Sequence, residues 1–144
     1  MWAGFRVGRR ARPGGPRIEH RSDSISVEGT HDGYSHLAGR PLHRRRWQFD
    51  GAGLVVEDDV SDAGSAALAR FHLAPGLTLA PAADQSHWRS AAGASVIAEV
   101  AIVAGRGHAE ASFHSPRFGA VEATSCLAVA LERGRATTRW TWAR

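Results

Sequence analysis

The chain alternates hydrophobic and polar residues in short runs, and Gly, Pro, Asp and Ser separate these runs. Trp47 and Phe49 alternate with polar residues and lead into Asp-Gly-Ala-Gly at 50–53, and a second run follows at 54–58. Two such runs around a glycine-containing turn predict a β-hairpin. Neither a heptad repeat nor a helical period of hydrophobic residues is present. The pattern therefore predicts an all-β, antiparallel protein with helix nearly absent.

Further strands are predicted where the same alternation recurs between turn residues. They cover 66–73, 77–79, 87–90, 95–103, 108–113 and 137–142, together with runs at Phe5 and Val7, at Ile25 and Val27, and at Leu127, Val129 and Leu131. The Ala-rich stretch 61–70 is compatible with a helix, but Gly64 and the following FHLAPG disfavour one. Turn signals at this spacing favour a sandwich of two sheets.

Length and composition limit the class of protein. With 144 residues, of which 43% are hydrophobic, the chain is long enough for one domain with a core. No apolar run approaches the roughly 20 residues that span a bilayer, and MWAGFRVGRRARPGG has no apolar segment of a signal peptide. The single Cys126 excludes an internal disulfide and a cysteine-based zinc site, and its apolar surroundings predict a buried side chain.

The charge of the chain is positive and unevenly distributed. All 18 basic residues are arginine, and with 14 acidic residues they give a net charge of +4. Residues 1–46 hold 10 Arg and 4 acids, a balance of +6, whereas residues 47–144 hold 8 Arg and 10 acids, a balance of −2. Guanidinium groups suit bidentate contacts with carboxylate, sulfate or phosphate. The first third would favour an acidic polysaccharide or a nucleic acid, although charge alone is explained more simply by a solvated surface.

The first candidate site is His31-Asp32-Gly33-Tyr34. Gly33 is expected to allow a turn with positive φ, and Asp32 to cap that turn by accepting backbone N–H groups. His31 and Tyr34 are both capable of proton transfer. Two interpretations stay open: a structural hydrogen-bonded cluster at a strand end, or a set of residues in direct contact with a substrate.

The second candidate site is His43-Arg44-Arg45-Arg46, which runs into the strand of Trp47. Successive side chains of a strand point to opposite faces, so His43 and Arg45 share one face and Arg44 and Arg46 the other. One pair would line a groove for an anionic sugar, and the other would stay solvated or pair with the acidic residues at 57–59. The face that carries Trp47 is expected to be the buried one, with Gln48 on the opposite side.

The six remaining histidines are scattered, at positions 20, 36, 72, 87, 108 and 114. None has the spacing of a local metal site, so no metal and no cofactor is expected from this chain. The glycine and nucleophile patterns of serine hydrolases, Rossmann folds and P-loops are absent. Aromatic residues near arginines leave a basic, nucleic-acid-binding β module open as a less favoured alternative.

Several motifs, taken in order, resemble the heparinase II/III family of polysaccharide lyases. VEGTHDGY at 27–34 and HRRRWQF at 43–49 resemble the family's H-D-G-Y strand end and the H-R-R strand that follows it. The opening MWAGFRVGRRARP resembles the segment that enters the family's C-terminal sandwich. LVVEDDV, FHLAPG and HSPRFG, at 54–60, 71–76 and 114–119, resemble two later strands and a late turn. The resemblance covers most of the chain.

The resemblance implies a fold and an activity. The family pairs an N-terminal α/α toroid with a C-terminal antiparallel β-sandwich of the super-sandwich type, and it cleaves uronic-acid polysaccharides by β-elimination. A base removes the proton at C5, and an acid assists the departure of the 4-O group. The family's catalytic Tyr and Asn or Glu lie in the toroid. Its catalytic His block and its metal ligands come just before the segment that this chain resembles.

The chain has no toroid and no H-x-H block, so the resemblance carries no catalytic residue over to it. It implies that residues 1–144 are the C-terminal β-sandwich domain, a fragment incomplete at its N-terminus, with residues 1–19 as an entering strand and Arg-rich loop. The candidates for substrate contact are His31, Asp32, Tyr34, His43 and Arg45.

The predicted function is that of the C-terminal domain of a polysaccharide lyase for acidic glycans, with the isolated chain inactive. The expected partners are an acidic polysaccharide or oligosaccharide and the toroid domain of the same enzyme, without a membrane. The resemblance implies a periplasmic or cell-envelope location, and any divalent metal would be bound by residues outside this chain. Two alternatives stay open: a stand-alone carbohydrate-binding sandwich and, less favoured, a nucleic-acid-binding module.

Overall fold

The computed structural model describes residues 10–62 and 67–143, which form eleven strands and no helix. The strands are β1 (Arg17–His20), β2 (Ser24–His31), β3 (His43–Asp50), β4 (Gly53–Val60), β5 (Leu68–His72), β6 (Thr78–Pro81), β7 (His87–Ala92), β8 (Ser95–Ala104), β9 (Arg106–His114), β10 (Glu122–Ala130) and β11 (Arg135–Trp142). No helix of the described residues is therefore available to cross a membrane. The run predicted at Phe5 and Val7 lies outside the described residues.

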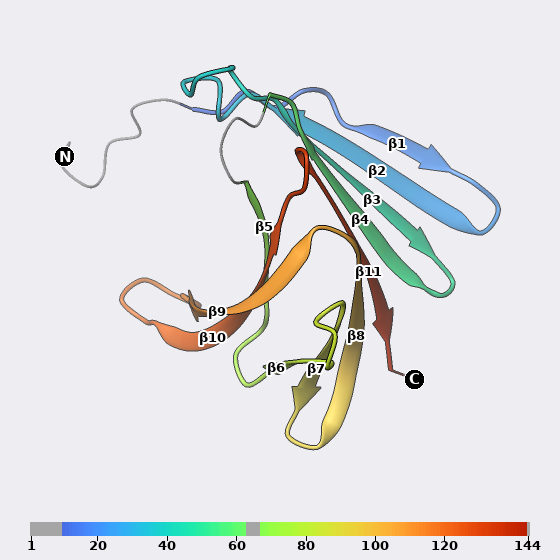
Figure 1. The fold of residues 1–144 in the computed structure, drawn as a ribbon, viewed down its shortest axis with the longest axis vertical. Coiled ribbons are helices and arrows are strands. Elements are labelled where there is room, and N and C mark those ends of the chain that lie inside the picture. The colour runs from blue at the N-terminus through green and yellow to red at the C-terminus, as the bar shows by residue number, and fades with distance from the viewer. Residues whose placement is uncertain (1–9, 63–66, 144) are drawn as a thin grey trace.

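The strands form two antiparallel sheets that pack face to face (Figure 1). Sheet A has the order β1-β2-β3-β4-β11-β8-β7-β6, and sheet B has the order β5-β10-β9. The core lies between them and is formed by Ala69, Leu127 and Val129 from sheet B and by Trp88, Val100 and Ala136 from sheet A. The predicted all-β sandwich is confirmed.

The hairpin of β3 and β4 forms as the sequence pattern predicts. Asp50 pairs with Gly53 across the turn. The Asp50 carboxylate accepts hydrogen bonds from the backbone N–H groups of Ala52 at 2.8 Å and Gly53 at 2.9 Å, which closes the turn. The register then places Arg45 directly opposite Asp58. Cross-strand neighbours share a face of the sheet, so both side chains are brought to the same side.

We call the face of sheet A that is turned toward sheet B its inner face, and the other its outer face. Val56 and Asp58 of the inner face are buried, at 2% and 3% exposed. Trp47 lies on the same face, as predicted, but is only half-buried, and Phe49 is 44% exposed. The three strands of sheet B are too few to cover all eight strands of sheet A. The inner face of β1–β3 is therefore left partly open, and Trp47 is less buried than predicted.

The other departures from the predicted elements are small. β1 was not predicted, because Ile18 is the only large apolar residue in it. Cys126 of β10 is 1% exposed and free, which confirms its predicted burial. Both faces of this strand are buried at 126–129, because the small side chains of Cys126 and Ala128 alternate with the core residues Leu127 and Val129. The helix considered at 61–70 is not formed by the described part of that stretch, which enters β5.

Candidate functional site

A cavity of about 240 Å³ lies where the ends of β3 and β4 meet β5 and the loop of residues 32–42. It is lined by Tyr34, Leu37, Pro41, His43, Arg45, Asp58, Val60, Ala67, Leu68, Ala69, Arg70 and Leu131. Three of the five predicted contact residues, Tyr34, His43 and Arg45, therefore face one cavity. His31 does not line the cavity but contacts His43, with the two ring centroids 4.9 Å apart.

The Asp58 carboxylate is the centre of this site. It accepts a hydrogen bond from His43 Nε2 at 2.7 Å and two from Arg45, at 2.7 Å from Nε and 3.0 Å from Nη2. Burial alone would raise the pKa of Asp58, but the hydrogen bonds from His43 and Arg45, with the nearby positive charge, hold it below its ordinary value. Asp58 is therefore an ionised, buried anchor for the two predicted contact residues.

The two histidines are joined to each other and to the loop. His31 Nε2 and His43 Nδ1 lie 2.9 Å apart, and the Gly33 backbone N–H donates to His31 Nδ1 at 3.1 Å. Burial, and then repulsion from His43 and Arg45, lower the pKa of His31, although Asp32 opposes this shift in part. An unbroken line of hydrogen bonds thus runs from the loop to the buried carboxylate.

Asp32 and Gly33 act differently from the prediction. The Asp32 carboxylate accepts the backbone N–H of Arg12 at 2.6 Å, so it holds the preceding segment rather than its own turn. Gly33 has no positive φ. A Cβ there would lie 3.0 Å from His31 Nδ1 and 3.2 Å from Ala11 Cβ, so a larger residue would force these neighbours to shift by a few tenths of an ångström. Tyr34 is 45% exposed, with its ring 5.4 Å from that of His31.

The cavity holds paired rather than free charge. Besides its bonds to Asp58, Arg45 lies over the Phe71 ring, 5.3 Å from the centroid, in a cation–π contact. Arg70 at the cavity is paired with Glu110 at 3.0 Å. One pair was expected to line a groove and the other to stay solvated or meet an acid across the hairpin. His43 and Arg45 line the cavity and also bind Asp58.

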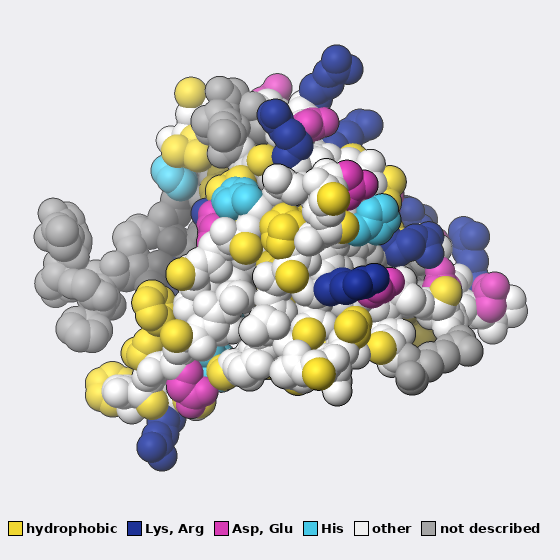
Figure 2. Space-filling model, turned by 60° about the horizontal axis from the view of Figure 1, so that its bottom comes forward, with side chains coloured by type: hydrophobic (Ala, Val, Ile, Leu, Met, Phe, Trp, Pro, Cys, Tyr) yellow, Lys and Arg dark blue, Asp and Glu magenta, His cyan; other side chains and the backbone are white. Residues whose placement is uncertain are grey.

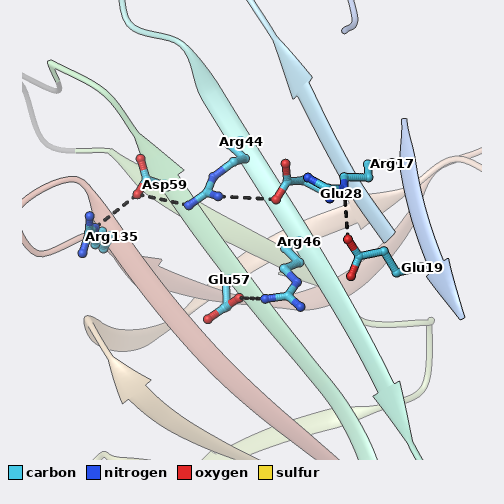
Figure 3. A network of polar contacts seen from close by, with 8 residues as sticks. All are labelled: Arg17, Glu19, Glu28, Arg44, Arg46, Glu57, Asp59 and Arg135. Carbon is cyan, nitrogen blue, oxygen red and sulfur yellow. Dashed lines mark hydrogen bonds and ion pairs between the residues drawn. The ribbon is translucent and has the colours of Figure 1, made fainter. Parts of the chain in front are cut away.

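Arg44 and Arg46 lie on the outer face in a network of surface ion pairs (Figure 3). Arg44 bridges Glu28 at 3.4 Å and Asp59 at 3.6 Å, and Arg46 approaches Glu57 at 3.6 Å. Arg135 also binds Asp59, at 3.1 Å, and Arg17 binds Glu19, at 3.0 Å. The same juxtaposition of arginine and carboxylate recurs on the face shown in Figure 2. Much of the basic run is therefore neutralised by neighbouring acids.

The described residues do not fit a metal ion. None of their His, Cys, Asp and Glu side chains gather in a group of three or more that would hold one. At the cavity, the Asp58 oxygens are taken by Arg45 and His43, and the facing nitrogens of His31 and His43 are taken by each other. These polar atoms therefore satisfy one another within the described residues.

Sequence reasoning missed Asp58 as the organising residue. The hairpin register was the available signal, because a turn at 50–53 places Arg45 opposite Asp58. Phe71 and Arg70 come from β5 in the other sheet, and no local pattern in the sequence indicates that they reach this cavity.

The fold and site together define an antiparallel β-sandwich domain with a cavity, lined by both polar and apolar side chains, at the ends of a long hairpin. Residues 1–143 match the family described as heparinase II/III-like, C-terminal. The chain belongs to this family, which confirms the resemblance read from its motifs. No match to a curated protein sequence was found.

Two solved structures have a similar fold. Heparinase III, described as the BT4657 gene product, aligns with 91% of this chain at a TM-score of 0.68 and 11% identity. Heparan sulfate lyase HepC from Pedobacter heparinus aligns with 94% of it at a TM-score of 0.66 and 9% identity. The chain spans only 21% and 22% of those two chains.

Proposed function

We propose that this chain is the C-terminal β-sandwich domain of a polysaccharide lyase that cleaves acidic, uronic-acid-containing glycans by β-elimination. Membership of the heparinase II/III-like C-terminal family carries the proposal, and the structural neighbours named heparinase III and heparan sulfate lyase agree with it. The elimination itself is assigned to residues outside this sequence, in and beside an α/α toroid. A periplasmic or cell-envelope enzyme is proposed on the same grounds.

The cavity at Tyr34, His43 and Arg45 is the proposed contact with the glycan. Arg45 is already bound to Asp58, so the cavity offers hydrogen bonds and an exposed aromatic ring more than net charge. Unpaired positive charge lies close by: Arg12 and Arg40 form no ion pair with another described residue. Arg12 is fixed beside the site through Asp32, and Arg40 lies in the loop 32–42. We propose that these two arginines meet the glycan's acidic groups.

A binding titration tests this assignment. The full chain is titrated with a uronate oligosaccharide and with a single-stranded DNA of matched charge, at low and at physiological salt. We expect weak glycan binding that falls as salt rises, since exposed charges are screened over about 8 Å at physiological ionic strength. Tyr34→Ala and Arg12→Ala should weaken it several-fold, whereas Arg44→Ala, on the outer face, should not.

The same titration has outcomes that contradict the proposal. His43 and Arg45 are expected to matter more than Arg44 and Arg46, and the reverse ranking would place the glycan on the outer face. Because Arg45→Ala leaves the Asp58 carboxylate uncompensated, its fold is checked by circular dichroism before its affinity is interpreted. Tighter binding of DNA, unaffected by any of these substitutions, would favour a nucleic-acid-binding module instead.

An activity assay tests the assignment of chemistry. The chain is incubated with heparan sulfate, alginate and chondroitin substrates, and the ultraviolet absorbance of an unsaturated uronate product is followed. No product is expected, because no base and acid pair for the elimination is assigned to this chain. Turnover that a chelator abolishes would contradict this and would return attention to His31, Tyr34 and His43.

A further inference from the structure

The hydrogen bonds around His31 fix the protonation state of two imidazoles. A backbone N–H can only donate, so His31 Nδ1, 3.1 Å from the Gly33 nitrogen, accepts and carries no proton. His31 Nε2–H then donates to His43 Nδ1 at 2.9 Å, and His43 Nε2–H donates to Asp58 at 2.7 Å. All three bonds exist together only when both rings are neutral with the proton on Nε2.

A further proton has no free position in this line. If it binds His31 Nδ1, that atom and the Gly33 N–H are both donors, and their bond is lost. If it binds His43 Nδ1, that atom faces the proton on His31 Nε2. His43 Nδ1–H and His31 Nε2–H would then be two donors facing each other. This is relieved only when the His31 proton moves from Nε2 to Nδ1, and the hydrogen bond from the Gly33 N–H is then lost. Protonation therefore breaks either the bond between the rings or the bond to the loop.

The surroundings disfavour that proton at neutral pH. The charged and titratable groups that act on the two rings are Asp32 and Tyr34 from the loop, Arg45 from β3 and Asp58 from β4. Arg70 of β5 lines the same cavity. Burial, His43 and Arg45 together outweigh Asp32 and lower the pKa of His31. The bond to Gly33 is therefore intact above the ordinary histidine range.

The hydrogen bond from the Gly33 N–H to His31 holds the loop that forms one side of the cavity. Gly33 opens the loop 32–42, and Tyr34, Leu37 and Pro41 of this loop line the cavity. Within the loop, His36 Nδ1 lies 3.2 Å from the Gly33 carbonyl oxygen and Leu37 N–H donates to the Tyr34 carbonyl at 2.9 Å. A change at Gly33 is thus passed to the residues that face the cavity.

We propose that the line from Gly33 through His31 and His43 to Asp58 is a pH-sensitive latch, which holds the loop 32–42 on the cavity while both imidazoles are neutral and releases it when one is protonated. The regulatory meaning rests on the proposed function, because the cavity is the proposed glycan contact. The latch itself is a property of the chain without ligand, and its test needs no glycan.

Nuclear magnetic resonance of the full chain tests the latch. Imidazole nitrogen shifts report the tautomer of His31 and His43, and hydrogen exchange reports the protection of the Gly33 amide. Above the ordinary histidine pKa we expect both rings as Nε2–H tautomers and a protected Gly33 amide. As the pH falls through the pKa of His31, protection corrected for intrinsic exchange should fall by up to tenfold per pH unit, together with the change in the His31 shifts.

Three variants make the test specific. In His31→Gln the side-chain carbonyl can still accept the Gly33 N–H but takes up no proton, so protection should become independent of pH. Gly33→Ala places a Cβ 3.0 Å from His31 Nδ1, so protection at residue 33 should be lost at all pH values. His114→Gln removes an exposed histidine at the end of β9 and should behave as the wild type.

The outcomes separate the latch from the proposed function. An Nδ1–H tautomer of His31 at high pH, or protection of Gly33 that stays constant while His31 titrates, would overturn the latch. So would a pH dependence that persists unchanged in His31→Gln. If that variant fails to fold, His31→Asn, whose side-chain carbonyl takes the place of Nδ1 and takes up no proton, gives the same comparison. Failure of glycan binding with a working latch would count against the proposed function only.

Discussion

Removing Arg45 is the sharpest perturbation of this domain, because it leaves a buried carboxylate with one partner. Arg45→Ala deletes two hydrogen bonds to Asp58, at 2.7 and 3.0 Å, and the contact with Phe71. The carboxylate is only 3% exposed and keeps His43 alone. Removing one partner of a buried ion pair costs about 3–5 kcal/mol. Since the Arg45 side chain is 23% exposed, we expect about 2–4 kcal/mol after allowance for solvent screening.

Arg44→Ala is the matched control for this experiment. Its side chain is 50% exposed and its ion pairs, at 3.4 and 3.6 Å, lie on the outer face, so its loss should cost less than about 1 kcal/mol. Urea titration followed by tryptophan fluorescence gives both free energies of unfolding. By thermal melting, the Arg45 variant should lose roughly 6–12 °C, at about 3 °C for each kcal/mol in a domain of this size.

The physical reason can be tested separately from the magnitude. Adding Asp58→Asn to Arg45→Ala removes the uncompensated charge, so the double variant should be more stable than the two single losses added together. Equal losses for Arg44→Ala and Arg45→Ala, or strictly additive losses in the double variant, would show that Asp58 is not the buried anchor described above.

Three further results are expected. Trp47→Ala should cost about 2 kcal/mol in urea, below the 3–5 kcal/mol of a fully buried ring, because Trp47 is only half-buried; a loss above about 4 kcal/mol would show that the inner face of β3 is covered. Unfolding free energy should decline as the pH drops below about 6.5 and again below 3.8, because His31 and Asp58 both have pKa values lowered from these ordinary ones, and native-state stability from a lowered pKa is lost on acidification. Asp58→Asn should reduce the loss in the lower window, to which Asp84 and Glu110 also contribute through lowered pKa values, and should leave the upper one. Cys126, 1% exposed and with its pKa raised by burial, should react with iodoacetamide only after unfolding, and rapid alkylation of the native chain would contradict its position in β10.

The sequence was enough to predict the strands whose alternation is complete. The hairpin of β3 and β4 follows from Trp47, Phe49 and the turn at 50–53, and its register follows from the turn length. β1 escaped prediction because one apolar residue in four, Ile18, is no alternation. The short sheet B was not predictable either, since its pairing of β5 with β10 joins residues far apart in the chain.

Three of the five predicted contact residues, Tyr34, His43 and Arg45, line one cavity, but the sequence did not predict how they are bonded. The strand period placed His43 and Arg45 on one face, and the structure confirms this. Whether Arg45 would stay free for a ligand could not be predicted from the sequence. That depends on Asp58, which is selected by register, and on Phe71, which is supplied by the other sheet. Gly33 illustrates the same limit. The lack of a side chain matters there because the His31 ring lies close, and not because the backbone has a positive φ.

The distribution of paired charge changes how this domain would meet a polyanion. The positive balance of the first 46 residues suggested that the run at 43–46 carries it, yet every arginine of that run is bound to an acid. An arginine in an ion pair still donates hydrogen bonds, but its charge is largely neutralised by the carboxylate. In the proposed function, the long-range attraction would come from arginines such as Arg12 and Arg40, which form no ion pair with another described residue. Arg45 and the histidines would determine shape and hydrogen bonding at short range. This division of roles predicts that salt weakens the association with a polyanion by screening Arg12 and Arg40. It also predicts that pH alters the cavity through the histidines.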